Sequence, residues 1–256
     1  MPSHEELSAL SDDGTIRTEL DGRVATVVLD RPDKCNALTM DMWRMLELTV
    51  RGLGEDPRVL AIVIVGAGRD FCAGADIREL PLDSDAFHRL HLAAERTIAD
   101  APKPVIAAVR GSCVGGGCEI AVAADLCFAE PTARFGITAS RLGVVYPYTP
   151  TQRLVAAVGR GRARRMLYGG ELFDAAWAER AGLVSEVVDG DVEEFAHGYA
   201  QMLVRRSQTT IAAARQNTAG TPADLAWPDT DYVEGIRAYR HGREPEFGTL
   251  PRPLRL

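Results

Sequence analysis

Residues 113–119, Cys-Val-Gly-Gly-Gly-Cys-Glu, join an apolar run to an alanine-rich segment through three consecutive glycines. The apolar run, residues 104–109, predicts a buried strand, and the segment that starts at Glu119 predicts the first turn of a helix. Glycine lets the backbone approach a ligand closely, and the unpaired N–H groups at a helix N-terminus stabilise negative charge. The stretch therefore predicts half of an oxyanion hole with an acid or base beside it, or else a glycine turn that only permits tight packing.

A second turn of small residues has the same character. The stretch Phe71-Cys-Ala-Gly-Ala-Asp-Ile-Arg78 follows another apolar run, residues 59–65, which predicts a second buried strand. Small side chains in this stretch allow a backbone N–H group to face a ligand. Two such turns can converge on one oxygen atom, and this favours the oxyanion hole over simple packing.

The overall composition limits the classes of function. The chain has 256 residues, of which 46% are hydrophobic, so it is long enough to bury the core of one domain with a helical extension. Its net charge of -7 argues against nucleic acid as a partner, because phosphate binding needs an electropositive face. The basic run at residues 160–165 is the local exception, as a solvated helix face or as an attractor of ligand phosphates.

No apolar stretch reaches the roughly 18 uncharged residues that a membrane-spanning helix needs. The N-terminal residues also lack the basic-then-apolar order of a signal peptide. We therefore expect a soluble, cytoplasmic protein without a membrane span.

The cysteines and histidines give little support for redox or metal chemistry. The five cysteines form no C-x-x-C pair and lie mostly in apolar segments, which is typical of reduced core residues. Cys72 and Cys118 flank the two turns, but no histidine is near either in sequence, and this argues against a nucleophilic thiol. His88 and His91 are expected on a partly exposed face of a helix over residues 83–101, so no metal site is predicted.

Nucleotide cofactors are not expected either. Phe71 stands where a dinucleotide-binding loop beginning at Gly66 needs its third glycine. The chain also contains no phosphate-binding loop of the G-x-x-x-x-G-K-S/T type. We therefore expect binding of neither NAD nor ATP.

Hydrophobic periodicity predicts strands alternating with helices in the first half of the chain and mainly helices in the second half, which favours an α/β fold. The predicted strands lie near residues 23–29, 59–65, 105–109, 126–129 and 184–188. The predicted helices lie near residues 40–53, 83–100, 117–124, 151–157, 161–168, 174–181, 192–205, 210–217 and 230–241. A TIM barrel would keep alternating to its end, so this imbalance counts against it.

Together with the opening stretch Leu29-Asp-Arg-Pro-Asp-Lys-Cys-Asn-Ala-Leu38, the two turns resemble the crotonase superfamily, the enoyl-CoA hydratase/isomerase group, in order and spacing. The resemblance covers residues 16–248 and continues through Phe135-Gly136, Leu142-Gly143, Thr151-Gln-Arg-Leu154, Ala181-Gly-Leu-Val184 and Glu234-Gly235. It implies a spiral of ββα turns over residues 1–195, followed by a helical oligomerisation region over residues 196–256. It also implies a homotrimer or a dimer of trimers. Tyr232, Ile236 and Tyr239 recur at helical spacing and are expected to pack against the same chain or a neighbour.

The resemblance implies an acyl-CoA thioester as the ligand and no cofactor beyond its CoA moiety. The N–H groups of Ala75 and Gly116 are the expected donors to the thioester oxygen, where they would stabilise an enolate. The remaining CoA-binding positions implied by the resemblance are Lys34, Asn36, Ala37, Ala73, Asp76, Ile77, Arg78 and Gly115. The adenine is expected near the first three of these.

Hydratases of the superfamily use two glutamates, of which Glu119 matches one. The other falls on Ala139, and a methyl group cannot transfer a proton. In one interpretation Glu119 alone moves a proton, as double-bond isomerisation requires. In another, Tyr146 is the reacting donor of an acyl-CoA decarboxylase, unless it is a core aromatic residue. A catalytically weak acyl-CoA-binding protein is the third alternative.

Overall fold

The computed structural model describes residues 14–80, 85–222 and 229–247. The strands are Thr15–Asp21 (β1), Val24–Asp30 (β2), Ala61–Gly66 (β3), Val105–Val109 (β4), Ser112–Val114 (β5), Leu126–Ala129 (β6), Arg134–Gly136 (β7), Leu172–Asp174 (β8) and Glu186–Val187 (β9). The helices are Met40–Glu55 (α2), Asp85–Ala99 (α3), Gly116–Ala123 (α4), Ala139–Leu142 (α5), Tyr148–Val158 (α6), Arg160–Gly169 (α7), Ala175–Ala181 (α8), Val192–Val204 (α9), Gln208–Thr218 (α10) and Asp229–Arg240 (α11), with a 3-10 turn at Pro32–Lys34.

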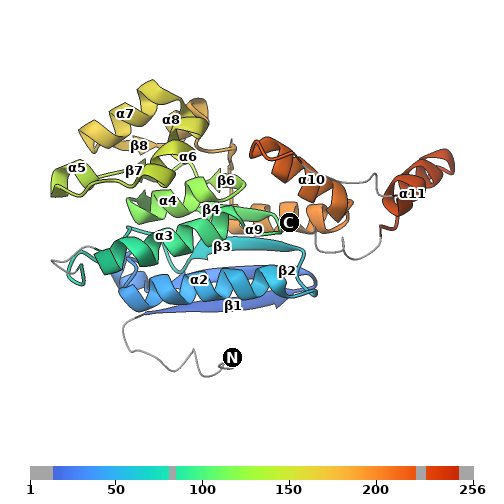
Figure 1. Ribbon diagram of the computed structural model, residues 1–256, viewed down its shortest axis with the longest axis horizontal. Helices are drawn as coiled ribbons and strands as arrows, with labels where there is room; N and C mark the ends of the chain where they lie inside the picture. Colours follow the sequence, from blue (N-terminus) through green and yellow to red (C-terminus); the bar gives the residue numbers. More distant parts are fainter. Residues whose placement is uncertain (1–13, 81–84, 223–228, 248–256) are drawn as a thin grey trace.

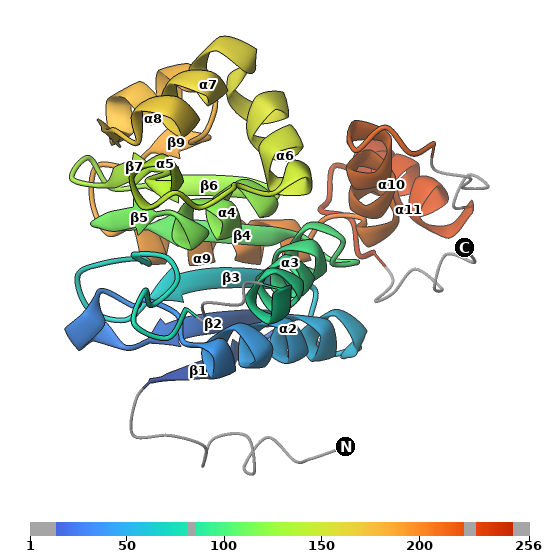
Figure 2. The same ribbon diagram turned by 60° about the vertical axis from the view of Figure 1, so that its left-hand side comes forward.

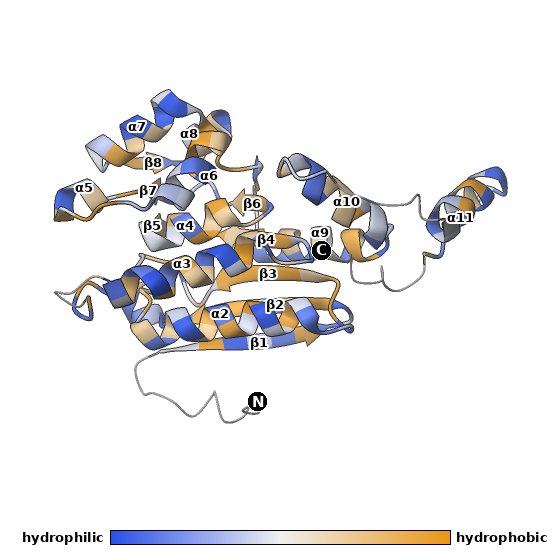
Figure 3. Cartoon of the chain, viewed as in Figure 1, coloured by the Kyte–Doolittle hydropathy of each residue, from blue (hydrophilic) through white to orange (hydrophobic). Residues whose placement is uncertain are grey.

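The main sheet has six strands in the order β1-β2-β3-β4-β6-β9, and every pair except β1–β2 is parallel. All residues of β3 are buried, as expected for a parallel strand that is covered on both faces. Ile62 and Ile64 belong to the core shared with α2, whereas Val63 and Val65 belong to the core shared with α9. Figures 1 and 2 show α2 and α3 on one face of the sheet and α9 on the other, and Figure 3 shows how apolar β3 is.

A second, three-stranded sheet has the order β5-β7-β8. Its strand β5 lies directly before the glycine turn and pairs in parallel with β7 through Cys113 and Phe135. Strand β8 then pairs antiparallel with β7. The glycine turn is anchored to this small sheet, because Gly115 N–H donates to Gly136 O of β7. Helix α4 begins directly after the turn and packs in the main core.

The α/β prediction is confirmed, and all the strands and helices predicted from periodicity are present with small shifts of their ends. The strand predicted at residues 184–188 is reduced to β9, which has only two residues. Four strands were not predicted: β1, β5, β7 and β8. The last three have only three residues each, too few to show an alternation of polar and apolar side chains.

Helices α10 and α11 project from the rest of the chain in both views (Figures 1 and 2). The division predicted between residues 195 and 196 falls inside α9, whose buried residues Val192, Ala196 and Ala200 pack on the main sheet. Tyr239 on α11 is 86% exposed and Ile236 is 38% exposed, so this apolar face is largely uncovered by its own chain. No helix in the described ranges is both long and apolar enough to cross a membrane.

Candidate active site

The two glycine turns lie against each other. Cys72 N–H donates to Ser112 O at 2.8 Å, and Val114 N–H donates to Cys72 O at 2.9 Å. A Cβ atom on Gly117 would lie 2.2 Å from that same Cys72 oxygen, so only glycine permits this approach. The glycines therefore let two backbone segments pack closely, as the packing interpretation expects, and this packing brings the two turns together, as the oxyanion-hole prediction requires.

The expected donors Ala75 and Gly116 lie side by side. A Cβ atom built on Gly116 would be 3.6 Å from the nitrogen of Ala75. The neighbouring N–H of Gly115 is used by Gly136 O at 2.8 Å, whereas the N–H groups of Ala75 and Gly116 donate to no other residue in the described ranges. Gly115 has φ +56 and is the N-cap residue of α4, so Gly116, the first residue of the helix, contributes one of the unpaired N–H groups of the helix start. The arrangement can receive an oxygen atom with developing negative charge.

A buried ion pair fixes the segment that carries Ala75. Arg31 donates to Asp76 at 2.7 Å and to the carbonyl oxygen of Ala37 at 3.1 Å. The side chains of Arg31 and Asp76 are 7% and 13% exposed, and hydrogen bonds from Arg31 hold the pKa of Asp76 below its ordinary value. Because Asp76 follows Ala75 directly, the ion pair restricts the direction of the Ala75 N–H group.

Glu119 lies one helical turn after Gly116 and is only 4% exposed. Burial raises the pKa of Glu119 to about 8, and the carboxyl group of Glu95 acts in the same direction. A hydrogen bond with the Tyr146 hydroxyl group acts in the opposite direction. Tyr146 therefore lies next to Glu119, a contact that the sequence did not predict, and burial raises the pKa of the Tyr146 hydroxyl group above its ordinary value.

His91 was missed as a site residue. The prediction of a partly exposed helix face is wrong for this residue, because it is 3% exposed and its Nε2 atom lies 3.8 Å from Oε2 of Glu119. Its ring stacks on Phe87 with a centroid distance of 4.6 Å and meets the edge of Trp43 at 6.0 Å. The apolar surroundings lower the pKa of His91 to about 4. A neutral imidazole therefore faces Glu119 at neutral pH.

Glu95 is a second buried carboxyl group near Glu119, one helical turn after His91 on α3. Arg153 of α6 donates to it at 3.0 Å and also faces Asp100 at 3.7 Å. Glu119 has no such cationic partner within the described part of the chain. Of these two carboxyl groups, Glu95 forms an ion pair with an arginine and Glu119 does not, so Glu119 is the one better suited to exchange a proton with a ligand.

Comparisons with known proteins identify the family of this chain. The sequence profile of the enoyl-CoA hydratase/isomerase family matches residues 19–226. The chain belongs to this family. It is 40% identical over 250 residues to a probable enoyl-CoA hydratase of Mycobacterium bovis, covering 91% of this chain and 97% of that protein.

Solved structures show the same fold for this enoyl-CoA hydratase/isomerase family member. The crystal structure of another family member matches it with a TM-score of 0.87 at 32% identity, over 95% of this chain and 100% of the other. An enoyl-CoA hydratase from Bacillus anthracis matches with a TM-score of 0.83 at 25% identity, over 92% of this chain and 99% of the other. The predicted crotonase-like fold is therefore confirmed.

In this family member, the position predicted for the second glutamate is the first residue of α5. Ala139 is half-buried and packs against the main core, as does Tyr146 beyond the end of the helix. Gly143 ends α5 in the left-handed region with φ +69, which returns the chain toward the core before Tyr146. The side chain of Ala139 is a methyl group and can supply neither an acid nor a base, and its assignment to the second glutamate position stays a prediction.

The predicted CoA-binding positions have unequal exposure. Lys34, Ile77 and Arg78 are exposed and Ala37, Ala73 and Gly115 are half-buried. Asn36 is fully buried, and its amide group donates to the carbonyl oxygens of Ala67 and Asp70. The side chain of Asn36 therefore holds the loop, and its contact with a ligand would come through the backbone.

The cysteines of this family member are unsuited to nucleophilic attack. Cys72, Cys113, Cys118 and Cys127 are buried and Cys35 is half-buried. Burial raises the pKa of Cys72 to about 12, so its thiol stays protonated at neutral pH. In the described part of the chain, no three metal-binding side chains gather in one place.

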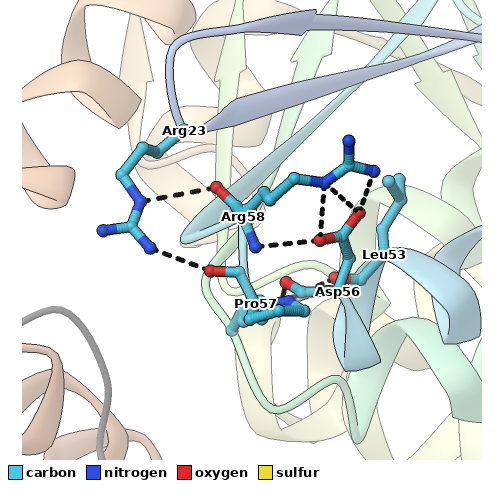
Figure 4. Close-up of polar contacts among 6 residues, drawn as sticks. Arg23, Leu53, Asp56, Pro57 and Arg58 are labelled. Atoms are coloured by element: carbon cyan, nitrogen blue, oxygen red, sulfur yellow. Dashed lines mark hydrogen bonds and ion pairs between the residues drawn. The ribbon is translucent and has the colours of Figure 1, made fainter.

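A cleft of about 690 Å³ lies away from these residues, between Arg23, the end of α9 and residues 244–247. Figure 4 shows that the Arg23 guanidinium group donates to the carbonyl oxygens of Pro57 at 2.8 Å and Arg58 at 3.4 Å. Arg58 is in turn paired with Asp56. This arginine therefore closes a turn, and the cleft shares no lining residue with the candidate active site.

Proposed function

We propose that this family member moves a double bond in an acyl-CoA thioester through an enolate, with Glu119 as the single acid and base. Glu119 takes a proton from the carbon between the thioester carbonyl and the double bond. The enolate oxygen receives hydrogen bonds from the N–H groups of Ala75 and Gly116. Glu119 then returns the proton to the far carbon of the former double bond, which leaves the double bond conjugated with the thioester.

The observation that carries this proposal is that Glu119 is a buried carboxyl group without an arginine or lysine partner in the described part of the chain, while the other predicted position holds a methyl group. Hydration needs one group to activate water and another to deliver a proton, whereas isomerisation needs one group to act twice. A group that both removes and returns a proton works best when its pKa is near the working pH. The pKa of Glu119, raised by burial to about 8, fits this requirement.

Decarboxylation is the second candidate, and the contact between Tyr146 and Glu119 supports it. Loss of carbon dioxide would also generate a thioester enolate, without a base, and a protonated Glu119 or Tyr146 would then supply the proton. Where Glu119 is that proton donor, decarboxylation needs Glu119 protonated at the start, whereas isomerisation needs it ionised. For isomerisation, kcat/KM should rise with pH and level off above about 8, whereas for decarboxylation it should fall there.

The test compares three substrates with the purified protein. A 3-enoyl-CoA reports isomerisation by the absorbance of the conjugated product, crotonyl-CoA reports hydration, and methylmalonyl-CoA reports decarboxylation. We expect isomerisation to be the fastest reaction and Glu119→Gln to slow it by roughly 10²–10⁴-fold. Binding of a saturated acyl-CoA should change by no more than a few-fold, since the amide keeps the shape of the acid. Isomerisation that is absent, or that Glu119→Gln leaves unchanged, would contradict the proposal.

A further inference from the structure

The orientation of the His91 ring is fixed by one backbone contact. Its Nδ1 atom lies 3.0 Å from the carbonyl oxygen of Phe87, one helical turn earlier. A carbonyl oxygen only accepts hydrogen bonds, so Nδ1 carries the ring proton of the neutral imidazole. The other nitrogen, Nε2, is then left with a lone pair, and it is this atom that faces Oε2 of Glu119.

The contact between the two side chains is electrostatic. The distance of 3.8 Å from Nε2 to Oε2 is longer than a hydrogen bond, and both side chains are 4% exposed. In such a dry environment the partial negative charge on Nε2 repels a carboxylate. The same lone pair attracts the O–H group of a protonated carboxyl. Packing between Phe87 and Trp43 prevents the ring from turning away.

We propose that His91 is a positioning residue that disfavours the ionised form of Glu119 and thereby makes this carboxyl group a stronger base. The proposal rests on the function proposed above, in which Glu119 removes a weakly acidic proton. A carboxylate that binds its proton more tightly is the better acceptor of such a proton. His91 acts through Glu119 and does not touch the substrate.

Other titratable groups near Glu119 act on it from different elements. Glu95, on the same helix as His91, also disfavours the carboxylate, and Arg153 of α6 weakens that effect because it pairs with Glu95. Tyr146 favours the carboxylate through its hydrogen bond. His88 approaches His91 on α3 and helps to keep it neutral. None of these groups occupies the position of the Nε2 lone pair, so a change at His91 alone isolates its contribution.

The test uses His91→Phe, which keeps a ring to stack on Phe87 and removes the lone pair. The side chains of His91 and Glu119 are already buried in the native protein, so this replacement changes the hydration of Glu119 little. The proton on Glu119 is followed directly by infrared difference spectroscopy of its carboxyl stretch, with Glu119→Gln as the reference that lacks the band. We expect the midpoint of this titration to fall by about one pH unit, a tenfold loss of proton affinity. The matched control His88→Phe, on the same helix, should leave the midpoint unchanged, because burial already keeps His91 neutral with a pKa of about 4.

The infrared titration needs no substrate, so it separates this proposal from the proposed reaction. If isomerisation is absent but the midpoint falls in His91→Phe, the proposed function fails and the role of His91 stands. If the folded His91→Phe protein titrates at the native pH or above it, the role of His91 is overturned. Where isomerisation is present, the midpoint of the kcat/KM profile should fall together with the infrared midpoint.

A second measurement on the native protein covers the case in which His91→Phe does not fold. Nitrogen NMR of histidine-labelled protein should show an unprotonated Nε2 and a protonated Nδ1 for His91 at neutral pH. The Nε2 resonance should shift with the titration of Glu119 and lose this shift in Glu119→Gln. A protonated Nε2 at neutral pH, or an Nε2 resonance that ignores Glu119, would overturn the proposal.

Discussion

Replacement of Glu119 by glutamine should stabilise the folded protein, and more strongly as the pH rises. Burial raises the pKa of Glu119 from 4.5 to about 8, so between these values the folded protein holds a proton that the unfolded chain has released. The free energy of unfolding of the native protein therefore falls as the pH rises through this interval. Glutamine carries no titrating proton and is free of this loss, while it keeps the shape of the acid.

The size of the effect follows from the same two pKa values. Each pH unit between them is worth about 1.4 kcal/mol, so the full interval from 4.5 to about 8 corresponds to at most about 5 kcal/mol. For a chain of this size, 1 kcal/mol shifts Tm by about 2–4 °C. The difference in Tm between Glu119→Gln and the native protein should thus grow by several degrees from pH 4.5 to pH 8.5.

Calorimetric melting at equal protein concentration and at a series of pH values measures this difference, since an oligomer melts in a concentration-dependent way. The exposed Glu186 of β9 provides the matched control, and Glu186→Gln should show a nearly constant difference from the native protein. A difference for Glu119→Gln that is flat across the pH range would mean that Glu119 ionises in the folded protein as it does in the unfolded chain. The assignment of Glu119 as a raised-pKa acid and base would then be refuted.

Three further changes test other parts of the structure. Gly116→Ala would place a Cβ atom 2.7 Å from the Trp43 ring, so it should destabilise the fold by about 1–3 kcal/mol in melting experiments and also lower kcat/KM. The control Gly161→Ala, which has open space around it, should cause neither effect. Ala139→Glu should raise crotonyl-CoA hydration at least about tenfold and the exposed Ser140→Glu should not; equal rates for both would remove Ala139 as the missing acid. Light scattering should report a homotrimer or a dimer of trimers that Ile236→Asp dissociates, and a native mass near 27.7 kDa would exclude this assembly.

The two glycine turns could be predicted from the sequence because their backbone conformation depends on neighbouring residues along the chain. Three consecutive glycines between an apolar run and a helix restrict the backbone wherever they occur, and Gly115 does adopt φ +56. The same local reasoning located α4 to within one residue and identified Glu119 as the carboxyl group beside the turn. The assignment of Ala139 to the second glutamate position also came from counting along the chain, and it stays a prediction.

The role of His91 could not be predicted in this way, because it depends on which helices pack together. Helix α3 is amphipathic and His91 falls on its buried side with Ala94 and Ile98, but this periodicity does not say which group the imidazole ring faces. The contact with Glu119 arises only when α3 packs against α4 across 28 positions of sequence. One signal was present: Phe87 and His91 are four residues apart on a helix, the spacing at which a ring can stack and a backbone carbonyl can be reached.

In the proposed mechanism, the alanine at position 139 changes which reaction the remaining groups favour. With two acids, each can keep one role, and neither needs a pKa near the working pH for both directions of proton transfer. With Glu119 alone, the same group must accept a proton from carbon and release it again in one catalytic cycle. A carboxyl group with an ordinary pKa would release it readily but accept it poorly. Burial together with Glu95 raises the proton affinity, Tyr146 limits the rise, and the balance near pH 8 is the one that a single proton shuttle requires.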